Sequence, residues 1–224
     1  MLARAVGDAR LGIFVFGLAW AEVTMTPVGL GIDRYLLRQV AADRGRVDAY
    51  FWNAMTMKLV RGVPLVIGSI VVIHLLDYSN ETDLTVSVLL LGLLFDTMAR
   101  SPANLFEAFE RNELVAATIV VQRMLAATLG LAVLLAGFGV VAVAITYSIG
   151  ALARFALSMQ LLRTRLGWPR MIRPADARRE IRKRSLTFTA QDIFGLVLAR
   201  ADVLLLGTLA TDAVVGQYGS PSHG

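Results

Sequence analysis

Apolar segments of membrane-spanning length constrain this chain more than any other feature of its sequence. They cover residues 11–32, 59–76, 84–109, 114–162 and 186–210. A single helix over residues 114–162 would extend about 73 Å, whereas the hydrocarbon core of a bilayer is only about 30 Å thick. The sequence AGFG at residues 136–139 supplies a turn that divides this segment in two. The pattern therefore predicts six membrane spans.

The predicted spans are helices rather than strands. A membrane β-barrel strand alternates apolar and polar residues over about ten positions, whereas these segments are apolar on all sides over longer stretches. Hydrophobic residues make up 56% of the chain and charged residues 17%, which leaves too little polar surface to cover six such helices in water. We therefore predict an all-α fold, a polytopic membrane helix bundle with about six transmembrane helices.

The net charge of +5 could indicate a nucleic-acid-binding protein, but the positions of the charges exclude that class. Nine of the 22 Lys and Arg residues lie within residues 163–184, in one connection between spans. Cations also lie in the connections after the first and third spans, whereas the connection at residues 77–83 carries only acidic charges. By the positive-inside rule, the basic connections face the cytoplasm. The sequence therefore predicts a multi-pass protein of the cytoplasmic membrane, with no nucleic-acid partner.

The two ends of the chain fit this topology poorly. Six spans place both ends outside, although the first ten residues include Arg4 and Arg10, which favour the cytoplasm. We therefore expect a fragment of a longer transporter-like chain, the alternative being a six-span protein with unusual ends. The expected parts are an outward loop remnant at 1–10, five helices over 11–162, a basic cytoplasmic loop or interfacial helix at 163–185, a sixth span at 186–210, and a truncated tail at 211–224.

Four short patterns occur in an order that resembles a known family. They are LARAVG with LGIF at 2–14, VGLGI at 28–32, FEAFER at 106–111, and RADVLLLG with VGQY at 200–218. Together they resemble the polysaccharide-biosynthesis flippases, the Wzx-type O-antigen transporters of the wider MATE-like exporter superfamily. The resemblance covers nearly the whole chain. It implies half of a two-bundle transporter, from helix two to helix seven.

The resemblance also implies a function. Flippases of this family move an oligosaccharide linked to a polyprenyl diphosphate across the membrane by alternating access. Charged groups in the bilayer centre cost about 2.5–3.5 kcal/mol on insertion scales, so they usually face a cavity or a partner. Because arginine stays protonated and binds phosphate oxygens bidentately, we expect Arg123, Arg154 and Arg200 to bind the anionic head group. For Arg123 and Arg154, snorkelling to the cytoplasmic boundary is the alternative.

The remaining charges within the spans have other expected roles. Asp96 and Arg100 are i, i+4 neighbours that could neutralise each other. Lys58 and Arg61 lie near the cytoplasmic end of their span, where we expect them to snorkel as anchors, with a cavity position as the alternative. The candidates for ion coupling or internal pairing are Glu22, Asp96, Arg100, Asp192 and Asp202.

Enzyme chemistry finds no support in the sequence. The chain has no cysteine and two histidines, which do not have a metal-ligand spacing. We predict no catalytic residues, no metal and no cofactor. Two alternatives to a flippase remain open. One is a drug or metabolite antiporter coupled to a cation through Glu22 or Asp96. The other is a scaffold whose basic loop recruits a polysaccharide polymerase or glycosyltransferases.

Overall fold

The computed structural model describes residues 8–172 together with 174, 176, 179 and 181. Over these residues the chain is helical and contains no strand, which confirms the all-α prediction. Within this described part of the chain, five helices are long and apolar enough to cross a membrane. The sixth predicted span, at residues 186–210, lies outside the described residues. The helices are α2 (Asp8–Gly29), α3 (Ile32–Ala42), α4 (Val47–Leu75), α5 (Asn80–Ala108), α6 (Asn112–Leu135) and α7 (Val140–Leu161), with a short 3-10 turn η1 (Arg44–Arg46) and a π-helical turn η2 (Leu162–Leu166).

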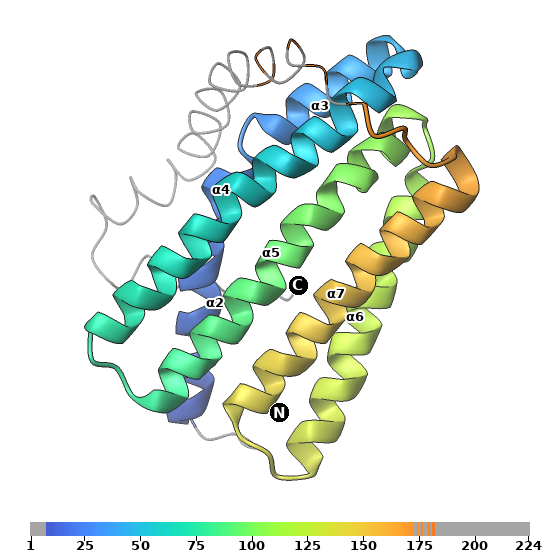
Figure 1. Ribbon diagram of the computed structural model, residues 1–224. Helices are drawn as coiled ribbons and strands as arrows, with labels where there is room; N and C mark the ends of the chain where they lie inside the picture. The colour runs from blue at the N-terminus through green and yellow to red at the C-terminus, as the bar shows by residue number, and fades with distance from the viewer. Residues whose placement is uncertain (1–7, 173, 175, 177–178, 180, 182–224) are drawn as a thin grey trace, which may run out of the picture.

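Helix α5 forms the centre of the bundle (Figure 1). It packs against α2, α3 and α4 on one side and against α6 and α7 on the other. More than half of its spanning window, 56%, is buried, whereas only 11% of the window in α6 is buried. Because α6 is apolar and yet exposed, its outer face suits contact with lipid chains.

The chain between the first span and α4 forms a further helix, α3, that the sequence analysis did not predict. α2 ends at Gly29, the chain turns at Gly31 with a φ of 71°, and α3 runs on to Ala42. The search for apolar segments did not find α3, because α3 is amphipathic rather than apolar throughout. Its buried residues follow the spacing of one helix face, which packs against α4 and α5. They are Ile32, Tyr35, Leu36 and Val40.

The turn predicted between the fourth and fifth spans is confirmed. α6 ends at Leu135 and α7 begins at Val140. Gly137 adopts a φ of 77°, a left-handed conformation that glycine reaches without steric cost. The two helices therefore run antiparallel and pack side by side (Figure 1).

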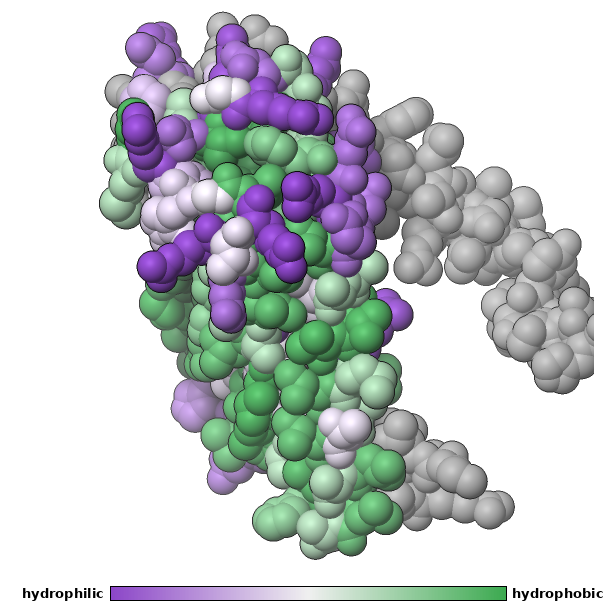
Figure 2. Space-filling model, turned by 90° about the vertical axis from the view of Figure 1, so that its right-hand side faces the viewer, coloured by the Kyte–Doolittle hydropathy of each residue, from purple (hydrophilic) through white to green (hydrophobic). Residues whose placement is uncertain are grey.

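The two ends of the bundle differ in charge. The end at α3 carries the cations of η1 and η2, whereas the opposite turn, at residues 76–79, is followed by Glu81 and Asp83. Figure 2 shows polar residues gathered at the α3 end and reaching down one face, above a lower half that is mostly apolar. By the positive-inside rule we expect the α3 end to face the cytoplasm.

Helix α7 approaches its two neighbours closely at small residues. A side chain on Gly92 of α5 would lie 3.0 Å from the Cα atom of Ser148. The hydroxyl of Ser148 donates a hydrogen bond to the carbonyl oxygen of Val88 at 2.9 Å. A side chain on Gly150 of α7 would lie 3.0 Å from the carbonyl oxygen of Gln122 in α6. These contacts bring the polar residues of α5, α6 and α7 within reach of one another.

We expect Gly92→Ala to destabilise the bundle. The added methyl group would force Ser148 and α7 outward, and overpacking of this kind costs about 1–3 kcal/mol. The matched control is Gly68→Ala in α4, because a methyl group there meets no atom within 4 Å. Thermal unfolding in detergent micelles should show a lower midpoint for Gly92→Ala alone. Equal midpoints for the two variants would contradict the close approach of α5 and α7.

Candidate functional site

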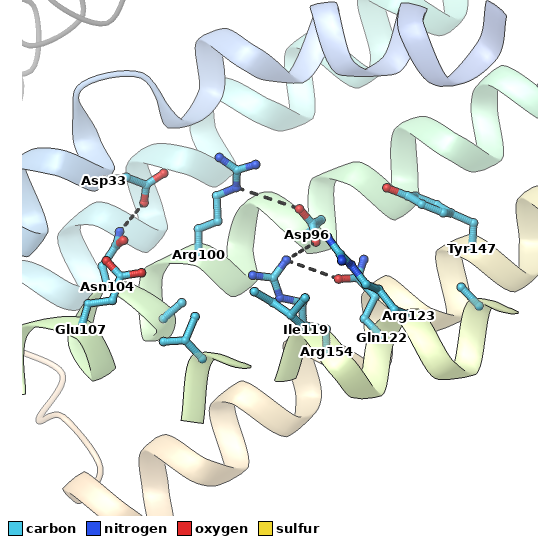
Figure 3. Close-up of a pocket in the computed structure, with 13 residues that line it drawn as sticks. Asp33, Asp96, Arg100, Asn104, Glu107, Ile119, Gln122, Arg123, Tyr147 and Arg154 are labelled. Atoms are coloured by element: carbon cyan, nitrogen blue, oxygen red, sulfur yellow. Dashed lines mark hydrogen bonds and ion pairs between the residues drawn. The ribbon is translucent and has the colours of Figure 1, made fainter. Parts of the chain in front are cut away.

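A polar cavity of about 530 Å³ lies between α5, α6, α7 and the start of α3. Figure 3 shows its polar side chains converging from these helices. Arg154 stands seven residues before the end of α7, about 10 Å from that end, and Tyr147 stands about 10 Å from the other end. The cavity therefore reaches the middle of a helix that is long enough to span a bilayer. Its charged residues are Asp33, Asp96, Arg100, Glu107, Arg123 and Arg154.

A network of Asp96, Arg154 and Gln122 joins α5, α7 and α6 within this cavity. The Oδ1 atom of Asp96 accepts a hydrogen bond from Nη1 of Arg154 at 2.6 Å, and its Oδ2 atom lies 4.0 Å from Nε of Arg100. The same Nη1 of Arg154 donates to Oε1 of Gln122 at 3.3 Å. One carboxylate thus faces two guanidinium groups, from α5 and α7 (Figure 3). The pairing lowers the free-energy cost of placing these charges within the bundle. The cluster of Asp96, Arg100 and Arg154 keeps a net positive charge.

Arg154 and Arg123 keep guanidinium donors that have no hydrogen-bond partner among the described residues. Nε of Arg154 is buried and has no hydrogen-bond partner among the described residues. Arg123 is exposed, lines the cavity and makes no ion pair with any described residue. Glu107 also lines the cavity, but it lies beside Asn104, well away from Arg123 (Figure 3). The part of the cavity around Arg123 and Arg154 can therefore bind an anion with several oxygen atoms.

Lys58 does not snorkel to the membrane boundary as the sequence led us to expect. Its side chain is fully buried, and its ammonium group donates to Oδ1 of Asp33 at 2.5 Å and to the carbonyl oxygen of Thr97 at 2.9 Å. The amide of Asn104 donates to the same Oδ1 atom at 2.7 Å. This cluster ties α4 to α3 and α5. The prediction failed because Asp33 lies on α3, the helix that the sequence did not reveal.

The small size of Gly29 makes room for this cluster. A side chain at Gly29 would lie 2.7 Å from Oδ2 of Asp33. Sequence reasoning missed Asp33 and Asn104, because neither stands alone in an apolar stretch and Asn104 carries no charge. The one signal available was Lys58, a cation within an apolar helix that required a partner.

A second cavity, of about 490 Å³, lies between α2, α3, α5 and α7. It contains Glu22, the remaining candidate among the described residues. Four residues line both cavities, so the two form one polar region around Arg100. The shared residues are Asp33, Asp96, Arg100 and Tyr147.

The structure thus brings together most of the described candidates. Arg123, Arg154, Asp96 and Arg100 surround the first cavity, and Glu22 lines the second. The other candidates, Arg200, Asp192 and Asp202, lie outside the described residues. Within the described part of the chain, no group of three or more His, Cys, Asp or Glu side chains could hold a metal ion.

Comparison with known proteins gives a match over almost the entire chain. The sequence model of a family described as polysaccharide biosynthesis protein matches residues 1–222. No curated protein and no solved structure matches the chain.

Removing one partner of the buried Lys58–Asp33 pair should destabilise the protein strongly. Lys58→Met leaves an unpaired carboxylate among α3, α4 and α5, and breaking a buried pair in this way costs about 3–5 kcal/mol. The double variant Lys58→Met with Asp33→Asn should recover much of that loss, because no charge then stays unpaired. Unfolding in detergent would measure the free energy of unfolding of the unmodified protein and of each variant. A double variant as unstable as Lys58→Met would contradict the pairing.

The cavity should be accessible to water-soluble reagents. The chain contains no cysteine, so a single introduced thiol reports on its own position. We expect Ala126→Cys, in the cavity wall, to react with a charged thiol reagent in membranes. Val120→Cys is the control, because Val120 is an exposed residue of the same helix outside both cavities. Similar labelling of the two positions would argue against an aqueous cavity.

Proposed function

The chain belongs to the polysaccharide biosynthesis protein family, and on that premise we propose that it translocates a lipid-linked oligosaccharide across the cytoplasmic membrane. The observation that carries the proposal is the first cavity, a hollow within a bundle of apolar helices that is lined by three arginines and three acidic residues. A flippase must shelter a diphosphate and its sugars from hydrocarbon. The first cavity supports that role, because it reaches the middle of a helix that is long enough to span a bilayer.

The chemistry of the cavity matches a diphosphate. Phosphate oxygens accept hydrogen bonds and carry negative charge, and arginine binds them with two parallel donors. Arg100, Arg123 and Arg154 present three guanidinium groups. Of the three acidic residues in the lining, Asp96 pairs with Arg154 and Arg100, Asp33 pairs with Lys58, and Glu107 lies away from Arg123 (Figure 3). In this proposal Asp96 also keeps Arg154 in place while the cavity is empty.

The outer face of α6 suits the polyprenyl tail. Val120 and Met124 are exposed on the same helix that lines the cavity with Gln122 and Arg123. A substrate could therefore keep its tail in the lipid while its head group lies among polar side chains. Alternating access in a two-bundle transporter requires the same separation of tail and head group.

The alternative functions have less support among the described residues. For a cation-coupled antiporter, Arg154 already occupies Oδ1 of Asp96 at 2.6 Å, and Glu22 belongs to no group of three acidic or histidine side chains among the described residues that could hold a metal ion. A scaffold that only recruits enzymes through its basic loop would not need a polar cavity in the middle of the membrane. We therefore favour translocation without enzyme chemistry.

Substitution of Arg123 provides the test. In the full-length protein, Arg123→Ala should reduce the export of polymer at least tenfold, because loss of one charge-assisted contact costs about 1.5–3 kcal/mol. Arg123→Lys should retain part of the export, since lysine supplies the charge but not the planar fork. Cell-surface polysaccharide, normalised to the amount of protein in the membrane, is the measurement.

Arg111→Ala serves as the control, because Arg111 is an exposed arginine at the α5–α6 turn, outside both cavities. Full export by Arg123→Ala would remove Arg123 from the mechanism. Equal losses in Arg123→Ala and Arg111→Ala would indicate a general effect of charge rather than a site.

A further inference from the structure

The two cavities differ in the hydrogen-bonding groups that they leave available. Around Arg123 and Arg154, the first cavity presents donors. The second cavity is lined by the cations Arg34 and Arg100 and also by three acceptors, which belong to Glu22, Asp33 and Tyr147. The acceptors of the second cavity match a sugar better than a phosphate. A diphosphate only accepts hydrogen bonds when it is ionised, whereas the hydroxyl groups of a sugar can donate them.

Glu22 is the first of the available acceptors. It is exposed on α2, lines the second cavity, and makes no ion pair or side-chain hydrogen bond with any described residue. The nearby hydroxyl of Thr26 donates to the backbone carbonyl of Glu22 at 2.7 Å and leaves the carboxylate untouched. A carboxylate at this depth needs either a partner or a polar ligand.

Asp33 supplies a second acceptor, and its orientation is set in advance. Lys58 and Asn104 both donate to Oδ1, which locks the side chain in one position. The other oxygen, Oδ2, is directed to the Gly29 side and accepts no hydrogen bond from the described residues. An acceptor that is fixed by buried neighbours can discriminate between ligands without a further cost of ordering.

Tyr147 stands where the two cavities meet. It lines both of them and is partly buried on α7 (Figure 3). Its ring offers an apolar surface, and its hydroxyl can donate or accept a hydrogen bond. This combination suits a sugar ring, which has apolar faces and a polar rim.

We propose that the second cavity is a saccharide subsite, in which Glu22 and Asp33 accept hydrogen bonds from the hydroxyl groups of the sugar next to the diphosphate. This inference rests on the proposed function and assigns the diphosphate to Arg123 and Arg154. Because Asp96 and Arg100 line both cavities, a sugar joined directly to the diphosphate can reach the second cavity while its phosphates remain in the first.

A divalent cation is a poorer occupant of the second cavity. Calcium needs six to eight oxygen ligands, and magnesium prefers a regular octahedron with carboxylate groups. The described residues contain no cluster of three acidic or histidine side chains arranged to hold such an ion. The available acceptors are instead spread over α2 and α3, at Glu22 and Asp33, with Tyr147 on α7.

The test compares bare and glycosylated probes. The full-length protein in lipid nanodiscs would be titrated with polyprenyl diphosphate, and with the same lipid carrying one glucose, galactose or N-acetylglucosamine. At least one glycosylated probe should bind more tightly than the bare lipid. Glu22→Gln should weaken the binding of that probe about tenfold, the size expected for one hydrogen bond to a charged group, and Tyr147→Phe should weaken it about threefold, the size expected for one hydrogen bond between neutral groups. Their affinity for the bare lipid should not change.

Two further variants complete the design. Glu113→Gln removes an exposed carboxylate outside both cavities and should bind every probe as the unmodified protein does. Arg123→Ala should weaken the binding of all probes, bare and glycosylated. That result tests the proposed function separately from the saccharide subsite.

Three outcomes would overturn the subsite. One is equal binding of the bare and glycosylated lipids to the unmodified protein. Another is an equal loss of affinity for both kinds of probe in Glu22→Gln. The third is full retention of sugar-dependent affinity in both Glu22→Gln and Tyr147→Phe. If bare polyprenyl diphosphate binds in an Arg123-dependent manner in those cases, the proposed function stands and the saccharide subsite does not.

Discussion

The cost of an unpaired charge in hydrocarbon governs this structure. Within a bundle made mostly of apolar residues, each buried charge needs a partner on another helix. Lys58 meets Asp33, and Asp96 meets Arg154. The first pair ties α4 to α3, and the second ties α5 to α7. Both pairs therefore set which helices lie together, in addition to the apolar packing that surrounds them.

The polar region exists because α5 is central and α7 packs closely. Small residues at Gly92 and Gly150 let α7 approach α5 and α6, which brings Arg154 to Asp96 and Gln122. The cavities lie between these helices and α3, and α2 also lines the second cavity. Charges that would be too costly on the lipid face are thus gathered on an inner surface, where they neutralise one another in part and leave donors and acceptors available for a ligand.

Much of the fold could be predicted from the sequence. The five described spans, the turn at residues 136–139 and the separation of basic from acidic connections follow from runs of apolar residues and the placement of charges. Helix α3 could not be found in the same way, because its hydrophobic residues occupy one face only. Asp33 and Lys58 are separated by 25 positions. No local pattern relates them, so the prediction assigned Lys58 to the membrane boundary.

The sequence by itself determined that this chain forms apolar helices of membrane-spanning length and that a few charges must lie among them. The hydrophobicity and the length of a segment depend only on residues that are neighbours along the chain, so the sequence is sufficient to predict the spans. The tertiary structure alone decided which charges meet. Asp96 faces Arg154 across 58 positions of sequence, and Glu22 faces a cavity shared by helices from both sides of α5. Pairing and cavity shape depend on the packing of whole helices, which no single segment encodes.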